Sequence, residues 1–451
     1  MGLSNISAKQ PSIPTASTLD TPVPIPPATV DGLLTDVFFA PLRVILETAA
    51  ITRQCLSLDD LAFATLSVLR ALQASANGRD FLQTHAIPLV PELTRSNYFA
   101  ALASPRRLAM MQALARHLRT NQLPNLRAQD DLLAVLPELQ GWEVWAADGH
   151  KIAHATHDPR HDKDQYAPIN ALYKLDLRTG YAEFLALAQP TARGIEHELT
   201  TLKRQAPAAL RCGATKGQHT LLAYDSAVID FQYAYELKQS KSIYLITRWK
   251  DNLAPVTTCA RPIDRTNPAN QLIISDETVV FKDTPGHWRK LTARAPDSDA
   301  IHILLTNEMT LPSGVLSECY RLRWRIEKAF DQQEQKLDER KAWAKSDTAK
   351  TIQALAICLA HNLLQLFNAT LKAEAALEDT KVITAYHKDL DRRAAKAKAA
   401  GRAFPKALYL ALYRPTELSL QFLRWLRYHL MQATCYWPAL ALLRPLMTQY
   451  L

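Results

Sequence analysis

Apolar residues recur along this chain with two different periods, and the change falls near Gly141. Over residues 31–140 they follow helical spacing, which predicts an all-α N-terminal unit. After Gly141 short runs of strand character alternate with helical ones. From about residue 346 to the end the pattern is helical again, with breaks at prolines. The pattern predicts three regions, with helices at both ends and a mixed α/β region between them.

One helix start in the N-terminal unit is marked clearly. Ser104 stands directly ahead of Pro105 and a long amphipathic run, which is typical of an N-cap followed by proline at the first helical position. Arg106 and Arg107 follow in the first turn. Their position makes them candidates for contacts to phosphate groups, so residues 31–140 are expected to form a DNA-binding domain.

The middle region reads as layered α/β structure. The predicted elements are strands at Trp142–Ala147, Ala171–Leu177 and Tyr181–Leu187, a helix at Ile195–Arg204, a strand at Thr220–Tyr224, a helix at Phe231–Gln239 and a strand at Ser242–Arg248. Three antiparallel strands followed by helix, strand, helix and strand are typical of an α/β sheet domain. Further strand-like runs at residues 252–307 predict a β-rich insertion within a domain spanning residues 141–345.

Composition and charge point to an anionic partner. The formal net charge is +9, and residues 381–428 carry eleven Lys and Arg against three acidic residues. A basic helical block of this kind is typical of DNA-backbone binding, which is driven by counterion release, although a solvated helix face remains an alternative. We expect residues 346–451 to bind DNA or to dimerise.

The remaining composition favours a cytoplasmic protein. The six cysteines are scattered without a CxxC pair, as expected for reduced thiols. The longest apolar run, at residues 351–368, is interrupted by polar residues that include His361 and Asn362, so no membrane anchor is expected. Residues 1–30 are rich in Ser, Thr and Pro and predict a disordered tail rather than a targeting peptide.

Three side chains near residue 323 carry the most specific signal. Tyr320, Arg323 and Glu327 stand at helical offsets of i, i+3 and i+7, which place a phenol, a guanidinium and a carboxylate on one helix face. Two upstream acids, Asp148 and Asp225, each follow a predicted strand. Adjacent strands would bring the two acids together, and a helix laid across the sheet could add Glu327.

Three separated carboxylates are the ligands that phosphoryl transfer with two hard cations requires. A lone Asp at a strand end is more often a turn former or helix cap, so the prediction depends on the group as a whole. Asp230 is the rival for the second position. We prefer Asp225 because Asp230 falls at a helix start, where capping explains it.

In these residues the chain resembles the DDE transposases of bacterial insertion sequences, of the IS-four family. Its members carry a Tyr-x2-Arg-x3-Glu-x6-Lys signature, which here reads Tyr320, Arg323, Glu327 and then Glu334 in place of the lysine. Lys336 projects to another face, whereas Lys341 returns to the correct face about two turns further on, so either weakened end binding or another lysine reaching in remains open. The resemblance implies an RNase H-like core with a β-rich insertion, flanked by the two helical regions.

The resemblance also implies a site and a reaction. Asp148, Asp225 and Glu327 would bind Mg²⁺, for which Mn²⁺ can substitute, while Tyr320 and Arg323 would hold phosphates of the element's end. The expected partners are double-stranded DNA, both the terminal repeats and the target, and a second copy of the chain on DNA. The expected location is the bacterial cytoplasm, in association with the nucleoid.

Other residues are weaker candidates for DNA contacts. Trp288 stands where the family stacks a tryptophan on a flipped base, although a core position is the commoner role for such a residue. Arg248 and Lys250, just past a strand, are candidates for backbone contacts. His150 begins a histidine-rich run that could suggest zinc, but we interpret it as a residue beside Asp148.

Two alternative functions remain open at this point. The absent lysine favours a catalytically inactive DNA-binding protein derived from a transposase. A metal-dependent nuclease that cuts without strand transfer is the second alternative, and an assay for joined product would distinguish it.

Overall fold

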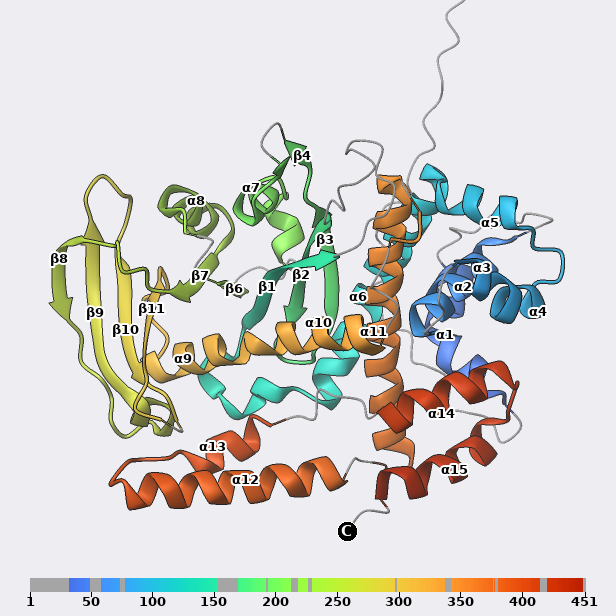
Figure 1. Ribbon diagram of the computed structural model, residues 1–451. Coiled ribbons are helices and arrows are strands. Elements are labelled where there is room, and N and C mark those ends of the chain that lie inside the picture. The colour runs from blue at the N-terminus through green and yellow to red at the C-terminus, as the bar shows by residue number, and fades with distance from the viewer. Residues whose placement is uncertain are drawn as a thin grey trace, which may run out of the picture.

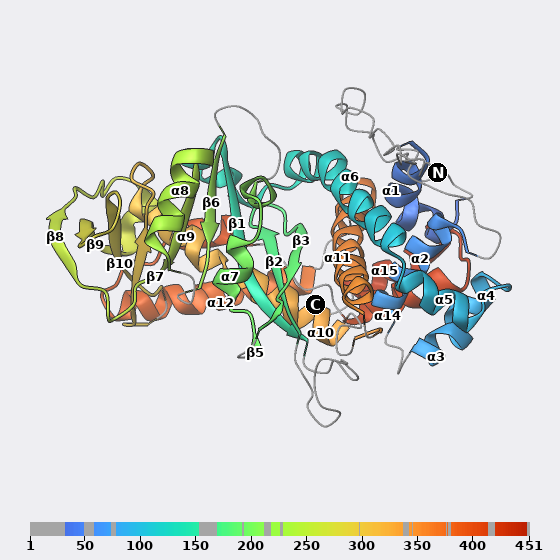
Figure 2. The ribbon, with the colours of Figure 1, turned by 90° about the horizontal axis from the view of Figure 1, so that it is seen from above.

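The computed structural model describes residues 32–48, 58–73, 78–152, 169–191, 194–211, 218–225, 229–296, 298–336, 342–344, 346–375, 377, 380–413 and 420–448. They form a sheet with helices on both faces, and a helical body that lies beside it (Figure 1 and Figure 2). The disordered tail predicted for residues 1–30 lies outside the described residues.

A nine-stranded mixed sheet carries the middle of the chain. Its strand order is β3-β2-β1-β6-β7-β11-β10-β9-β8, with β1 parallel to β6 and β6 parallel to β7. The bounds are β1 (Trp142–Ile152), β2 (Ile169–Asp176), β3 (Ala182–Leu187), β6 (His219–Ala223), β7 (Ile243–Arg248), β8 (Pro255–Ala260), β9 (Ile273–Phe281), β10 (Trp288–Arg294) and β11 (Ile301–Thr306); a separate ribbon pairs β4 (Pro190–Thr191) with β5 (Gly194–Ile195). Each strand that the sequence predicts is present, and β8 is an addition.

The predicted insertion is part of the same sheet. Strand β11 pairs antiparallel with β7, so β8 to β11 extend the five preceding strands without a break. We expected residues 252–307 to form a β-rich insertion within the domain, and in the structure their strands prolong the central sheet on one side. The cause lies in β11, which returns to the edge of β7 and satisfies that strand's backbone groups.

Helices cover both faces of the sheet. The short α7 (Glu198–Lys203) and α8 (Phe231–Lys241) lie on one face, and α9 (Ser313–Leu322) and α10 (Trp324–Lys336) lie on the other. Alternate residues of β1 point to the two faces, as the strand period of two requires. Trp145 belongs to the core beneath α7 and α8, whereas Val144 and Ala146 belong to the core beneath α9 and α10.

The helical body is built from both ends of the chain. Its N-terminal members are α1 (Leu34–Thr48), α2 (Asp60–Leu72), α3 (Gly78–Phe81), α4 (Ile87–Leu89), α5 (Arg95–Leu102) and α6 (Pro105–Gln129), and its C-terminal members are α11 (Asp347–Ala375), α14 (Leu420–Met431) and α15 (Tyr436–Thr448). They share one hydrophobic core. Two further helices, α12 (Thr380–Ala399) and α13 (Lys406–Ala411), run beneath the sheet (Figure 1).

Helix α11 joins the two bodies. It packs against α2 and α6 on one side and against β3 on the other. By length and composition it could cross a membrane, but 78% of its most apolar window is buried inside the protein. The polar residues within it also find partners: the Asn362 amide exchanges two hydrogen bonds of 2.8 Å with the backbone of Ala182, and the His361 ring lies 2.9 Å from the Gly180 carbonyl oxygen.

The start of α6 is as the sequence predicts, but its arginines have a different role. Ser104 is the N-cap and accepts from the Arg107 backbone N–H at 3.4 Å. The Arg107 side chain is buried and donates to the carbonyl oxygens of Leu58 and Asp59, while Arg106 pairs with the buried Asp60. The expectation that Arg107 contacts phosphate is therefore wrong, because it closes the turn ahead of α2.

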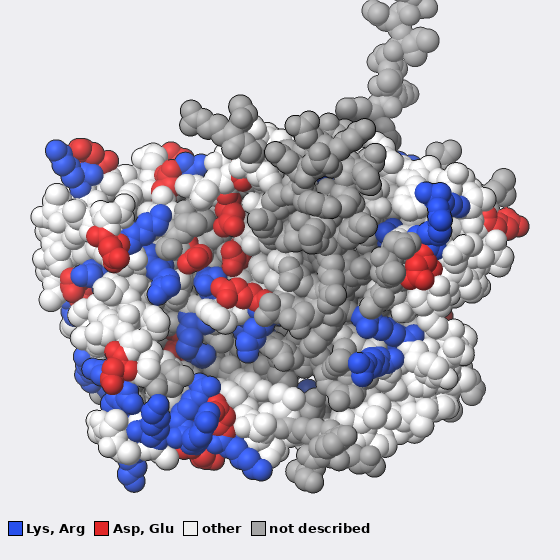
Figure 3. Space-filling view, in the orientation of Figure 1, with Lys and Arg blue, Asp and Glu red and all other residues white. Residues whose placement is uncertain are grey.

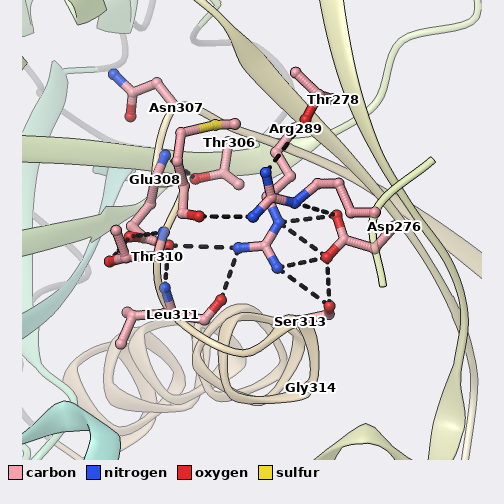
Figure 4. A network of polar contacts seen from close by, with 12 residues as sticks. Asp276, Thr278, Arg289, Thr306, Asn307, Glu308, Thr310, Leu311, Ser313 and Gly314 are labelled. Atoms are coloured by element: carbon pink, nitrogen blue, oxygen red, sulfur yellow. Dashed lines mark hydrogen bonds and ion pairs between the residues drawn. The ribbon is translucent and has the colours of Figure 1, made fainter. Parts of the chain in front are cut away.

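A buried ionic network fixes the start of α9 to the outer part of the sheet (Figure 4). Arg289 on β10 donates to both oxygens of Asp276 on β9, at 2.5 and 2.8 Å, and to the carbonyl oxygen of Leu311 at 2.7 Å. Ser313, the first residue of α9, donates to the same Asp276 at 2.7 Å. A second contact is steric, since a Cβ on Gly314 would lie 2.0 Å from the carbonyl oxygen of Ala269.

Removing the central cation of this network should destabilise the fold strongly. Arg289→Met keeps the length of the side chain but leaves Asp276 and Glu308 buried without their main counter-charge, so we expect a loss of about 3–5 kcal/mol in unfolding free energy. Arg294→Met on the same strand removes an exposed pair and should cost less than about 1 kcal/mol. Urea unfolding measures both, and equal losses would contradict this role.

Candidate active site

Asp148 and Asp225 lie side by side on neighbouring parallel strands. The register pairs Ala146 of β1 with Ala223, the last residue of β6. Asp148 follows two residues later within β1, and Asp225 stands two residues beyond the end of β6. Because parallel strands are about 4.8 Å apart, both carboxylates stand at one level and on one face of the sheet. This register is the one that the predicted juxtaposition of the two acids requires.

The surroundings of Asp148 differ from the prediction in one respect. We expected its strand to end at Ala147, but β1 continues to Ile152 because β2 pairs with it antiparallel along that length. Asp148 therefore stands where β1 loses its neighbour β6, and not at a strand end. The backbone under this carboxylate is held by β2, opposite Tyr173.

Glu327 reaches the same place from α10, which packs across β1. The Arg323 guanidinium bridges the two elements, at 3.2 Å from an Asp148 oxygen and 2.8 Å from a Glu327 oxygen. Its carbon lies 5.7 Å from the centre of the Tyr320 ring. The prediction that these three helix residues share one face is confirmed.

The helix that carries them is not uniform. Helix α9 ends and α10 begins at Arg323, where the Arg323 N–H bonds to the Tyr320 carbonyl at 3.0 Å and the Ile326 N–H to the Arg323 carbonyl at 2.9 Å. Both are i→i−3 bonds, so the turn is locally tightened while Arg323 keeps right-handed helical angles. This turn brings the guanidinium over the end of β6 and the middle of β1.

Burial among like charges dominates the electrostatics. The pKa of Asp148 is raised from 3.8 to about 6, first by burial and next by the charge of Glu198, while Arg323 opposes the rise. Burial also raises the pKa of Glu198, and the charge of Asp225 adds to that rise. The site thus holds more negative charge than Arg323 alone balances.

Glu198 is the member of this group that the sequence did not reveal. It lies in the first turn of α7, on the sheet face opposite α10, and its carboxylate covers Gly149. The predicted helix began at Ile195, which made Glu198 an ordinary polar position in its interior. No spacing or motif in the chain marks it.

Tyr320 and Arg248 line the rim of the site. Burial raises the pKa of the Tyr320 phenol, Arg323 and Arg248 lower it, and the charge of Asp225 raises it further. Arg248 is exposed at the end of β7, and Lys250 is half-buried in the turn that follows. Arg248 is the last residue of β7 and Lys250 follows it by two residues, so both lie near the strand end at which we predicted them.

Two predicted DNA contacts are corrected by the structure. Trp288 is 3% exposed and packs edge-on against Phe231, because β10 directs it into the core beneath α8, so it is not a surface stacking platform. His150 is 7% exposed and stacks on Phe330 of α10 at 4.6 Å, so its ring supports α10 rather than facing DNA.

The rival second acid has a structural role. Asp230 is the N-cap of α8, accepts from the Tyr233 N–H at 2.8 Å and pairs with Lys203. N-capping of α8 therefore explains an aspartate at position 230. The side chain of Glu334, and the histidines at 154, 157 and 161, lie outside the described part of the chain.

The donor set fits a divalent metal chemically, since carboxylate oxygens are the ligands of Mg²⁺. In the part of the chain that the structure describes, no three His, Cys, Asp or Glu side chains are grouped closely enough to hold a metal ion. At this site the Arg323 guanidinium lies between Asp148 and Glu327. A metal here requires the guanidinium to withdraw.

Asp148 should make stability depend on pH. Its pKa of about 6 in the fold exceeds the ordinary 3.8, so the fold favours the protonated form; the stability gained is present below pH 3.8 and is lost as pH rises through 6. Asp148→Asn should therefore gain roughly 2 kcal/mol relative to the parent between pH 4 and pH 7.5. Urea unfolding without divalent metal measures it, with Asp251→Asn, an exposed carboxylate, as control. A difference that stays constant with pH would contradict the burial of Asp148.

Comparison with known proteins agrees with this geometry. Residues 142–363 match the family model described as the transposase DDE domain. Comparison with curated proteins gave no match. The matched segment starts at the first residue of β1, ends within α11 and includes Asp148, Asp225 and Glu327. The family consists of DNA-processing enzymes that generally use divalent metal. Over these residues, just under half of its length, this chain is similar to the transposase DDE domain family.

Proposed function

We propose that this chain is the transposase of a bacterial insertion sequence of the IS-four family, which cuts DNA at the element's ends and joins the freed ends to target DNA. One observation carries the proposal: two aspartates stand at one level on parallel strands, and a helix brings a glutamate to them beside a Tyr and an Arg. Few sites other than those for phosphoryl transfer need three carboxylates with a phosphate-binding rim.

The fold supports the RNase H-like assignment. The order β3-β2-β1-β6-β7, with the first three strands antiparallel and the last two parallel to β1, is the order of an RNase H-like sheet. The carboxylates lie where β6 ends beside β1. Ligands of open α/β sheets generally bind at such carboxyl ends of strands.

In this proposal Asp148, Asp225 and Glu327 hold two Mg²⁺ ions, or Mn²⁺ in their place. When bound, the ions activate the attacking oxygen and stabilise the charge that develops on the phosphate and the leaving oxygen. The sheet fixes the first two carboxylates and the tightened turn at Arg323 fixes the third. Asp148 lies within β1 and Glu327 within α10, while Asp225 follows the end of β6 by two residues.

Arg323 has two roles in the proposal. Without metal it neutralises Asp148 and Glu327, as the 3.2 and 2.8 Å contacts indicate. If those carboxylates held cations, the guanidinium would be free to turn toward Tyr320, whose ring centre lies 5.7 Å from its carbon. There it can donate two charge-assisted bonds to a DNA phosphate, and Arg248 and Lys250 add positive charge along the same edge.

The basic helix α12 extends this surface. Lys388, Arg392 and Lys396 are exposed at every fourth position, and basic side chains gather over α12 and α13 in Figure 3. The carboxylate of Asp389 neutralises part of the charge of Arg392. We propose that α12 binds the DNA backbone, and that two copies of the chain act together because an element has two ends.

One observation favours a second candidate. The family's signature lysine is replaced by Glu334, which would repel DNA at that point. A DNA-binding protein without catalytic activity, derived from a transposase, would show binding and no cleavage. A nuclease without strand transfer would show cleavage and no joined product.

Cleavage of a labelled fragment that carries the element's own terminal repeats tests the proposal. We expect Mg²⁺-dependent nicking at the repeat boundary and joined product with target DNA. Asp225→Asn and Glu327→Gln should lower cleavage by at least about 1000-fold while DNA affinity changes little, because they remove cation ligands and not phosphate contacts. Asp230→Asn, which keeps an N-cap on α8, should cleave normally. Binding without cleavage in either metal would favour the inactive protein.

Charge removal on α12 tests the DNA-binding surface. Changing Lys388, Arg392 and Lys396 to Ala together should reduce the slope of log affinity against log salt by roughly 2 to 3, since each lost phosphate contact reduces it by about 0.9. Lys241→Ala at the end of α8, on the other side of the sheet, should leave the slope unchanged. Fluorescence anisotropy over a salt series measures both. An unchanged slope in the triple variant would remove α12 from the DNA-binding surface.

A further inference from the structure

Arg70, near the end of α2, places a guanidinium in the interior of the helical body. The residue is 3% exposed and makes no ion pair with any residue that the structure describes. Its Nη1 donates to the Tyr98 hydroxyl at 3.3 Å, and its Nε has no hydrogen-bond partner among the described residues. A buried charge is unfavourable unless an opposite charge or several hydrogen bonds compensate it.

Three aromatic rings surround this guanidinium. Its carbon lies 4.4 Å from the ring centre of Trp343, 5.7 Å from that of Tyr98 and 5.9 Å from that of Phe81. Cation–π contacts of this kind offset part of the lost hydration. They provide no acceptor for the N–H groups, however, so the rings hold the cation in place without satisfying its donors.

Two neighbouring side chains also carry buried donors without acceptors. Gln73 follows Arg70 by one turn on α2, and its Nε2 has no hydrogen-bond partner among the described residues; the same holds for the Nε1 of Trp343. Residues three apart on a helix share a face, and the backbone N–H of Trp343 is itself held by Gln353 at 2.8 Å. All three unsatisfied atoms are donors. Buried donors are nearly always paired, so this group indicates a ligand with several acceptor oxygens.

Gly78, the first residue of α3, lies between Arg70 and the surface. A Cβ at this position would stand 3.0 Å from the Nη2 of Arg70 and 3.1 Å from the Phe99 ring, so glycine allows α3 to begin close to the guanidinium. Two further arginines are exposed here: Arg79 is the next residue, and the guanidinium carbon of Arg95 lies 5.8 Å from the centre of the Phe99 ring. Their positive charge favours the approach of an anion.

We infer that Arg70, Gln73 and Trp343 bind a phosphate group. Phosphate supplies the negative charge and the acceptor oxygens that a guanidinium, an amide and an indole N–H require. A free phosphate ion and a phosphate of the DNA backbone offer this same chemistry. The bound group ties α2 to the segment that leads from α10 into α11. The site includes none of the carboxylates near Asp148, so it is independent of the cations in the proposed function.

The effect of phosphate on the melting temperature of the full chain tests this site. A ligand that binds only the folded state raises the melting temperature, which is measured in sodium phosphate and in sodium chloride at equal ionic strength and pH. Arg70→Met keeps the length of the side chain and should reduce the rise that phosphate produces. Arg116→Met, an exposed arginine of α6, is the matched control and should retain the full rise. Any general effect of phosphate acts on both variants, so their difference measures the site.

Trp343→Phe is the second variant. It keeps an aromatic face over the guanidinium but removes the indole N–H, so calorimetric titration with inorganic phosphate should give an affinity about 10-fold below that of the parent. Gln73→Leu removes another donor and should weaken the affinity by a similar factor. Circular dichroism establishes that each variant is folded, and these two variants decide the question if Arg70→Met does not fold.

A salt series with duplex DNA distinguishes the two sources of the phosphate. If DNA supplies it, Arg70→Met should reduce the slope of log affinity against log salt by about 0.9. If a free ion occupies the site, the slope stays the same while the affinity for inorganic phosphate is lost. Either loss supports the site. Equal responses of the parent and the three variants in both measurements would overturn it, and the donors would then bind only buried water.

Discussion

The parallel pairing of β1 with β6 is the constraint on which the rest of the site depends. A shift of one residue in this register would turn every side chain of β6 to the other face. The shift is prevented because both faces are buried: Leu222 and Tyr224 fill the core beneath α7 and α8, and Leu221 and Ala223 fill the core beneath α10. The packing of apolar residues thus sets the level at which two carboxylates meet.

Arg323 reduces the electrostatic repulsion that this arrangement of carboxylates creates. Carboxylates gathered at one edge of a sheet repel each other, and a guanidinium that contacts two of them offsets the repulsion while it ties α10 to β1. The outer strands of the sheet also position this turn, because they hold the opposite end of the pair formed by α9 and α10. The network of Asp276 and Arg289 holds the start of α9. The turn at Arg323 follows the end of this helix, so its position relative to the outer sheet is fixed.

The sequence was sufficient for elements and contacts that follow local patterns. The strands, the N-cap at Ser104 and the shared face of Tyr320, Arg323 and Glu327 all rest on short-range patterns. Contacts across the sheet could not be predicted from the sequence, because no local pattern encodes them.

Three features depend on contacts of this kind. Glu198 approaches Asp148 only through the packing of α7 on β1 and a glycine neighbour. The extension of the sheet by residues 252–307 depends on where β11 returns, and the burial of Trp288 depends on α8 above it.

The position of α11 has a consequence for how the chain matures. This helix fills the core of the N-terminal helices and also covers the edge of the sheet at β3, yet it is made after both. During synthesis, the apolar faces of α2 and α6 stay open to water until α11 has left the ribosome. The N-terminal helices therefore cannot reach their final stability before the sheet domain has been made. Both bodies complete their folding in one late step, when α11 packs against them. A chain that stops before α11 would leave those apolar faces exposed, where chaperones and proteases could bind them.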